Sequence, residues 1–142
     1  MSEPRPSPEH ALVLIVEDHA DTCDMYRDYL QFVGFRVLCA TTAEQAIESA
    51  LAHHPAVIVM DVQLPNMTGT EAVAVLKSHP TSASIPILLL SGHAMAHERA
   101  VGLSAGADGY VSKPCLPEEL ANQIRALVNR PPSGGNRKSD AA

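Results

Sequence analysis

Five short apolar runs are spaced along the chain, and most of them are continuous rather than alternating. A continuous run of this length is typical of a strand that is buried on both faces, as in a parallel sheet. The pattern therefore predicts five strands, most of them with neither face open to water. The runs are ALVLIV from Ala11, FRVLCA from Phe35, AVIVM from Ala56, IPILLL from Ile85 and the weaker GYV from Gly109.

The segments between these runs carry apolar residues at helical spacing. Gly34 is expected to end the first helix, and Pro80 follows the third. The segment AMAHERAVGLSAG from Ala94 has a shallow, alanine-rich face, which predicts a weakly held helix. The other predicted helix faces consist of Thr22, Met25, Tyr29, Leu30 and Val33; of Ala43, Ala46, Ile47, Ala50 and Leu51; of Ala72, Val73 and Leu76; and of Leu120, Ile124 and Leu127.

Strand and helix thus alternate five times along the chain. This alternation indicates an α/β fold, with a five-stranded parallel sheet, helices on both faces and right-handed crossovers. Residues 11–130 form the one predicted domain. Residues 1–10 are polar and proline-rich and are expected to be a flexible leader, and residues 131–142 are expected to be a disordered tail or linker.

The composition indicates a single hydrophobic core and argues against nucleic acid and membrane as partners. The chain has 142 residues, of which 46% are hydrophobic and 18% are charged, a size that favours one domain. Its net charge of -6 argues against a nucleic-acid-binding surface. No apolar run approaches the ~20 residues of a membrane span. The first ten residues also lack the apolar region of a signal peptide.

Three cysteines, Cys23, Cys39 and Cys115, form no Cys-x-x-Cys motif. Their odd number and their spacing predict neither a zinc site nor a disulfide framework, and a reducing cytoplasm is the expected location. Cys115 is expected to be a small packing residue, with redox sensitivity as the alternative. Met25 and Met60 are both expected in the core.

Polar side chains follow four of the predicted strands. Glu17 and Asp18 come directly after the first strand, Asp61 after the third, Ser91 after the fourth, and Lys113 shortly after the fifth. Parallel strands end at a common edge of the sheet, where ligands bind at the switch in strand order. Residues nearly 100 positions apart are therefore expected to meet in one cleft.

These residue types suit the acceptance of a phosphoryl group. Three carboxylates in one cleft repel one another unless a cation joins them, and hard oxygen ligands suit Mg²⁺. A carboxylate such as Asp61 can also act as the nucleophile and form an aspartyl-phosphate. Lys113 supplies a positive charge and Ser91 a hydroxyl donor for the phosphoryl oxygens.

Four sequence motifs occur in order, each at the end of a predicted strand: LIVEDH, VIVMDVQLPNMTG, PILLLSGHA and GADGYVSKP. Together they resemble the response-regulator receiver domain of two-component signalling, in a single-domain form similar to chemotaxis regulators. The resemblance covers Ala11 to Asn129. It implies a flavodoxin-like (βα)5 fold with strand order 2-1-3-4-5.

The resemblance also implies a role for each matching residue. By this resemblance Asp61 is the phosphoacceptor, and the phosphoryl oxygens are contacted by Ser91 and Lys113. Mg²⁺ is bound by Glu17, Asp18, Asp61 and the backbone carbonyl of Gln63. The resemblance further implies that Ser91 and Tyr110 form the switch, that the Lys113–Pro114 peptide bond is cis, and that Gln63 and His93 tune the phosphoryl lifetime. The family often has threonine where Ser91 stands, and an aromatic residue where Cys115 stands.

Each of these residues also has a plainer interpretation. Asp18 is a possible helix N-cap, and Asp61 a possible loop-capping residue. Ser91 alone would be a turn serine and Lys113 a surface lysine. His93 and His97 are four residues apart, the spacing of two zinc ligands on one helix face, although no further ligand is evident.

The leading functional interpretation is a phosphoacceptor that is not an enzyme. Its expected partners are a histidine kinase or histidine phosphotransfer protein as donor, and a downstream protein that binds the face built from the fourth helix, the fifth strand and the fifth helix. Neither nucleic acid nor membrane is expected as a partner, and a monomer or weak dimer is expected. The alternatives are an adaptor that acts without phosphorylation, a receiver excised from a hybrid histidine kinase, and a small phosphatase, although Gln63 stands where such an enzyme has a second acid.

Overall fold

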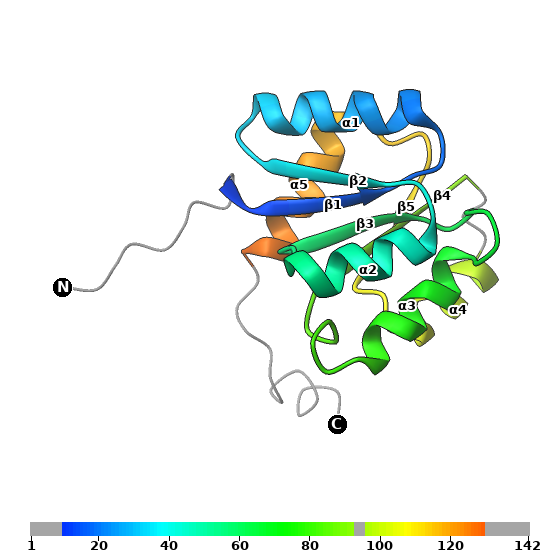
Figure 1. The fold of residues 1–142 in the computed structure, drawn as a ribbon. Coiled ribbons are helices and arrows are strands. Elements are labelled where there is room, and N and C mark those ends of the chain that lie inside the picture. The colour runs from blue at the N-terminus through cyan, green and yellow to red at the C-terminus, as the bar shows by residue number, and fades with distance from the viewer. Residues whose placement is uncertain (1–9, 93–95, 130–142) are drawn as a thin grey trace.

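The chain folds around a five-stranded parallel sheet. The computed structural model describes residues 10–92 and 96–129, and the strands lie in the order β2-β1-β3-β4-β5 (Figure 1). The predicted fold class and strand order are therefore confirmed. The strands are β1 (Leu12–Val16), β2 (Arg36–Ala40), β3 (Val57–Asp61), β4 (Ile87–Ser91) and β5 (Gly109–Ser112).

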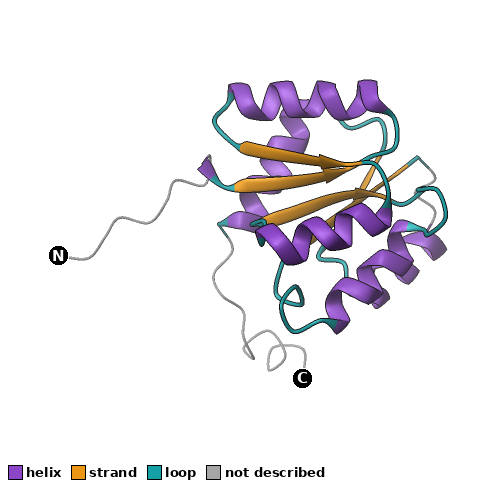
Figure 2. Cartoon of the chain, in the orientation of Figure 1, coloured by secondary structure: helices purple, strands orange, loops and turns teal. Residues whose placement is uncertain are grey.

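Helices cover both faces of this sheet (Figure 2). Helices α1 and α5 pack on one face, and α2 and α3 pack on the other, where α4 lies against α3 and β5. Among the residues that the structure describes, no helix is long and apolar enough to cross a membrane. The helices are α1 (Ala20–Phe32), α2 (Ala43–His53), α3 (Gly69–Ser78), α4 (Ala96–Ala105) and α5 (Pro117–Val128).

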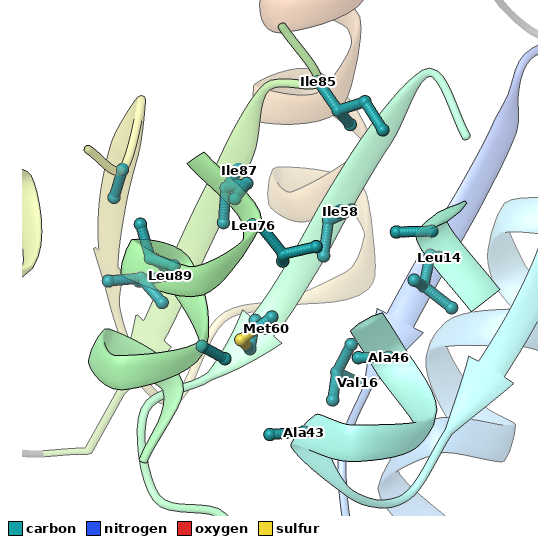
Figure 3. Packing of buried hydrophobic residues seen from close by; sticks show 14 of the residues in the cluster. Leu14, Val16, Ala43, Ala46, Ile58, Met60, Leu76, Ile85, Ile87 and Leu89 are labelled. Carbon is teal, nitrogen blue, oxygen red and sulfur yellow. The ribbon is translucent and has the colours of Figure 1, made fainter. Parts of the chain in front are cut away.

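The three central strands are buried as their continuous apolar runs predict. On the face covered by α2 and α3, Leu14, Ile58 and Met60 belong to one cluster of buried side chains that also includes Ala46 and Leu76 (Figure 3). The alternation of side chains along each strand sends the intervening residues to the opposite face, against α1 and α5. The burial predicted for Met60 is confirmed.

Strand β2 differs from the central strands, because it is not buried on both faces. This strand lies at the edge of the sheet, pairs only with β1, and exposes Arg36 and Cys39. An edge strand has no second neighbour, and the helices beside it cover it incompletely. The apolar run FRVLCA contains the arginine that marks this difference.

The buried face of α1 also differs from the predicted one. Cys23, Tyr26 and Leu30 are buried, whereas Met25 is 45% exposed. The predicted face was rotated by about one residue toward Met25, because cysteine and tyrosine give a weaker apolar signal than methionine. Gly34 follows the helix with φ 111, a conformation that glycine adopts without a steric penalty.

A disulfide joins Cys23 of α1 to Cys39 of β2, so the expectation of no disulfide was wrong. Cys23 lies on the helix face that packs on the sheet, and the two Cα atoms are 6.7 Å apart. This distance lies within the range of about 4.4–6.8 Å that disulfides span. Cys115 is a buried free thiol.

Lys77 ties together the segments that precede β4 and β5. Its ammonium donates hydrogen bonds to the carbonyl oxygens of Ala83 and Ile85, at 3.1 and 2.8 Å, and to Asp108 Oδ2 at 3.1 Å. The backbone N–H of Ile87 donates to the same Asp108 oxygen at 2.9 Å. This network fixes the sheet at the end opposite the predicted site.

Candidate functional site

The first two acidic groups of the site come from β1 and β3. Glu17 directly follows β1, and Asp61 is the last residue of β3. The two strands pair in parallel with Val16 opposite Met60, so the two carboxylates lie at the same edge. Both side chains are buried, with 2% of Glu17 and 7% of Asp61 exposed. Burying two negative charges is costly without a compensating cation.

Lys113 provides part of that compensation. Its ammonium donates to Asp61 Oδ2 at 2.7 Å and to Glu17 Oε1 at 3.2 Å. Its backbone N–H donates to the carbonyl oxygen of Ser91 at 2.8 Å, which holds the lysine over the ends of β3 and β4. Burial by itself lowers the pKa of Lys113, but the hydrogen bonds and charges of Asp61 and Glu17 outweigh burial, and the pKa is raised.

His19 is a member of the cluster that the sequence interpretation missed. Its Nδ1 atom lies 3.0 Å from Glu17 Oε2 and 3.3 Å from Asp18 Oδ1. The hydrogen bond with Glu17, followed by the charges of Asp18 and Glu17, raises the pKa of His19. The N-cap of α1 is His19, which leaves the capping interpretation of Asp18 without support. The histidine in LIVEDH was the available signal.

The loop after Asp61 folds tightly against the end of β3. The backbone N–H of Gln63 donates to Asp61 Oδ1 at 2.9 Å, and that of Gly69 donates to the carbonyl oxygen of Val62 at 2.8 Å. A Cβ atom on Gly69 would lie 2.5 Å from the carbonyl oxygen of Asp61, so only glycine fits there without a backbone shift. Thr68 then starts α3 with a capping box.

Ser91 and Tyr110 lie on the neighbouring strands. Ser91 is the buried last residue of β4, next in sequence to Leu90, which pairs with Asp61. The ring of Tyr110 is buried, and Arg99 lies 5.9 Å from its centroid. Within residues 10–92 and 96–129, the buried Tyr110 hydroxyl has no hydrogen-bond partner. The Lys113–Pro114 peptide bond is cis.

His93 lies outside the described residues. The same is true of the side chain of His97, so the zinc interpretation of this pair stays untested.

The donor set of the site fits a hard divalent cation. One ligand atom from each of Glu17, Asp18 and His19 lies within 4.8 Å of the others, and Asp61 adds a third carboxylate at the same sheet edge. Carboxylate oxygens suit Mg²⁺, which also keeps several waters. Lys113 brings one positive charge to an edge with three carboxylates, so a cation would complete the charge balance.

An apolar groove runs beside the site, between α1 and the loop that follows Lys113. Its volume is about 470 Å³. The groove includes two exposed apolar side chains, Met25 and Leu116. It is lined by Thr22, Met25, Tyr26, Lys113, Pro114, Cys115, Leu116 and Pro117.

Comparisons with known proteins bear on the family of the chain. The family model described as "Response regulator receiver domain" matches residues 13–125. The transcriptional regulatory protein PrrA of Mycobacterium tuberculosis is 32% identical over 128 residues, which cover 90% of this chain and 54% of PrrA. The chain spans about half the length of the curated relatives it matches.

Solved structures have a similar fold. The chemotaxis response regulator CheY4 of Vibrio cholerae superposes with a TM-score of 0.78 at 31% identity, covering 82% of this chain and 98% of that one. The receiver domain of the sensor histidine kinase PA1611 of Pseudomonas aeruginosa, with a magnesium ion coordinated in its active site cleft, superposes with a TM-score of 0.78 at 27% identity. That match covers 84% of this chain and 98% of the other.

Proposed function

The chain belongs to the response regulator receiver family of two-component systems, and from that premise we propose that it accepts a phosphoryl group on Asp61. The observation that carries the proposal is the position of the Asp61 carboxylate, which is buried at a strand end and hydrogen-bonded to Lys113 at 2.7 Å. The corresponding receiver domain is proposed to comprise residues 11–130.

Mg²⁺ is proposed to bind Glu17, Asp18, Asp61 and the backbone carbonyl of Gln63. The chemistry of the donor set supports this assignment, as does the magnesium ion in the active site cleft of the PA1611 receiver domain. When bound, the ion supplies positive charge for the phosphoryl oxygens.

Different side chains have different roles in the proposed phosphoryl transfer. An Asp61 carboxylate oxygen attacks phosphorus, a P–O bond forms, and the P–N bond of a donor phosphohistidine breaks as the imidazole leaves. Lys113 and the Ser91 hydroxyl stabilise the transferred phosphoryl oxygens. Gln63 and His93 are proposed to tune how long the aspartyl-phosphate lasts.

A histidine kinase or a histidine phosphotransfer protein is the proposed donor. The apolar groove lined by Met25 and Leu116 adjoins Lys113 and offers a surface on which a protein donor can pack. The proposed output surface is the face of α4, β5 and α5, because Tyr110 and the weakly apolar α4 lie there. The negative net charge supports a protein rather than nucleic acid as the target.

Mass spectrometry after incubation with acetyl phosphate and Mg²⁺ tests the proposal. The parent protein should gain one phosphoryl group, and Asp61→Asn should gain none, since the amide is not a nucleophile of comparable strength. Asp28→Asn is a matched control, because it removes an exposed carboxylate of α1. Excess chelator should abolish labelling of the parent.

Three outcomes would contradict the proposal. Labelling of Asp61→Asn at the parent's rate would exclude Asp61 as the acceptor. The absence of labelling in the parent would favour an adaptor that acts without phosphorylation. Turnover of an added phosphate ester would indicate a phosphatase.

A further inference from the structure

Cys23 and Cys39 are joined at a position where α1 and the sheet both contact the acidic cluster. The backbone N–H of Cys23 donates to the carbonyl oxygen of His19 at 3.1 Å, the first hydrogen bond of α1. The residue after Cys39 is Ala40, whose carbonyl oxygen accepts from the N–H of Glu17 at 2.9 Å. The disulfide therefore joins the two backbone segments that flank Glu17 and Asp18.

The same helix also reaches the lysine side of the site. Tyr26 lies three residues after Cys23 on the buried face of α1, and its hydroxyl donates to the carbonyl oxygen of Cys115 at 2.8 Å. Cys115 is two residues after Lys113. A shift of α1 would therefore move both the backbone next to Glu17 and Asp18 and the loop that follows Lys113.

The two cysteines differ in their exposure to solvent. Cys39 is exposed on the edge strand β2, whereas Cys23 is buried with 4% exposed. An oxidant in solution therefore meets Cys39 first, and Cys23 is positioned to complete the bond. Cys115 is a different case, because it is buried in the core and burial raises the pKa of its thiol, which disfavours the reactive thiolate.

We propose that Cys23 and Cys39 form a reversible redox modification site, whose oxidation by a peroxide fixes α1 and β2 around Glu17 and Asp18 and strengthens divalent-cation binding there. The part of this proposal that concerns the cation rests on the function proposed above. The reduced dithiol leaves the start of α1 less firmly held, and the acidic pair less well ordered for a cation.

The oxidation is balanced with hydrogen peroxide as the oxidant. The Cys39 thiolate attacks one peroxide oxygen, the O–O bond breaks, and hydroxide leaves, giving a sulfenic acid. The Cys23 sulfur then attacks the Cys39 sulfur, forming the S–S bond and releasing the second oxygen as water. The two thiols lose two electrons and two protons, and one peroxide becomes two molecules of water. A dithiol reductant reverses the bond by exchange.

Thiol mapping is the first part of the test. The full chain is treated with hydrogen peroxide or with a dithiol and is then unfolded in denaturant, so that a maleimide reaches every free thiol, buried or exposed. The blocked positions are read by peptide mass spectrometry. Peroxide should protect Cys23 and Cys39 from the maleimide, and the dithiol should expose both. A protected pair that includes Cys115, or labelling of all three cysteines after peroxide, would overturn the proposal.

Hydrogen exchange without metal is the second part, and it does not depend on the proposed function. Amides of residues 17–26 should exchange about fivefold faster in the reduced protein, at the lower end of typical couplings between sites. Cys39→Ser should behave as the reduced form under both treatments, and because Cys39 is exposed this variant is expected to fold. Cys115→Ser should keep the full redox difference. Identical exchange in both redox states would overturn the proposal.

Titration with Mn²⁺ is the third part. We expect the oxidised protein to bind about fivefold more tightly than the reduced protein, and Cys39→Ser to show no redox difference. If both forms bind equally, the proposed link to the cation site is wrong. If neither form binds Mn²⁺, the function proposed above fails, while the exchange result still decides whether the thiol pair controls α1.

Discussion

Replacing Lys113 with methionine tests the electrostatics of the site directly. Lys113→Met keeps an unbranched side chain of similar length but removes the ammonium that contacts Asp61 at 2.7 Å and Glu17 at 3.2 Å. The two carboxylates stay buried, and their main positive neighbour is gone. We expect the metal-free variant to be clearly less stable than the parent.

The size of the loss follows from the burial of the three groups. Removing one partner of a buried ion pair costs about 3–5 kcal/mol, because the other charge stays buried without compensation. The Lys113 side chain is 27% exposed, so water screens part of the interaction in the parent. We therefore expect a loss of about 2 kcal/mol in the free energy of unfolding at neutral pH.

Urea unfolding with and without Mg²⁺ measures this loss. A cation that binds only the folded state adds stability by mass action, and the variant should gain more than the parent because no ammonium competes for the carboxylates. Lys77→Met is a matched control. It also removes a lysine paired with an acid, Asp108, but away from the acidic cluster, so Mg²⁺ should restore none of its loss.

The pH dependence of the free energy of unfolding is an independent test of the Lys113 interaction, and the direction of the change follows from the pKa of Lys113. The pKa of Lys113 in the folded protein is raised above its ordinary value of 10.5. Its stabilisation is therefore fully present below pH 10.5 and is lost as the pH rises through the folded-state pKa. The difference between parent and variant should be present at neutral pH and should narrow as the pH rises above 10.5.

A small effect would refute this reasoning. If Lys113→Met loses less than about 0.5 kcal/mol, the pair behaves as an exposed salt bridge. In an Asp61→Asn background the lysine should matter less, with a coupling energy of at least about 1 kcal/mol. Strict additivity of the two substitutions would mean that Lys113 and Asp61 do not interact.

Two further predictions concern the surroundings of the site. Burial raises the pKa of Tyr26 from 10.0 to about 12, so the unfolded protein ionises first and the free energy of unfolding should fall between these pH values. Tyr26→Phe should flatten that fall in urea titrations at a series of pH values. Gly69→Ala would bring a Cβ to 2.5 Å from the carbonyl oxygen of Asp61, and we expect it to cost about 1–3 kcal/mol and to weaken Mg²⁺ binding. Unchanged affinity in a titration of this variant would show that the loop backbone does not position the site.

The central strands and their terminal acids were predictable because two simple constraints act on them. Val57 to Met60 must be apolar because they lie between two layers of helices. Asp61 is the first polar residue after this run, which marks it as a candidate site residue at the end of the strand. Parallel pairing then places Glu17 and Lys113 at the same edge, whatever their distance in sequence. Neither constraint depends on details of side-chain packing.

The features that were not predicted depend on the rotation of a helix about its axis, on which strand lies at the edge of the sheet, and on contacts between particular side chains. The rotation of α1 that buries Cys23 and exposes Met25 follows from packing on the sheet, which the apolar pattern of the helix alone does not specify. The exposure of Cys39 requires knowing that β2 is an edge strand. The disulfide combines both facts, so the spacing of the cysteines gave no signal for it. His19 was missed because a histidine beside two acids suggests a partner only once the side-chain geometry is known.

The hydrogen bonds of Lys77 bear on where foreign sequence can be inserted into this chain. One ammonium holds two carbonyl oxygens of the α3–β4 connection and a carboxylate next to β5, so these three acceptors must keep their mutual spacing. A fluorescent module spliced into that connection would separate Ala83 from Ile85 and leave a partly buried lysine short of acceptors. The α3–β4 turn looks like an ordinary surface connection in the ribbon, yet it is an unsuitable splice point for a biosensor built on this receiver (Figure 1).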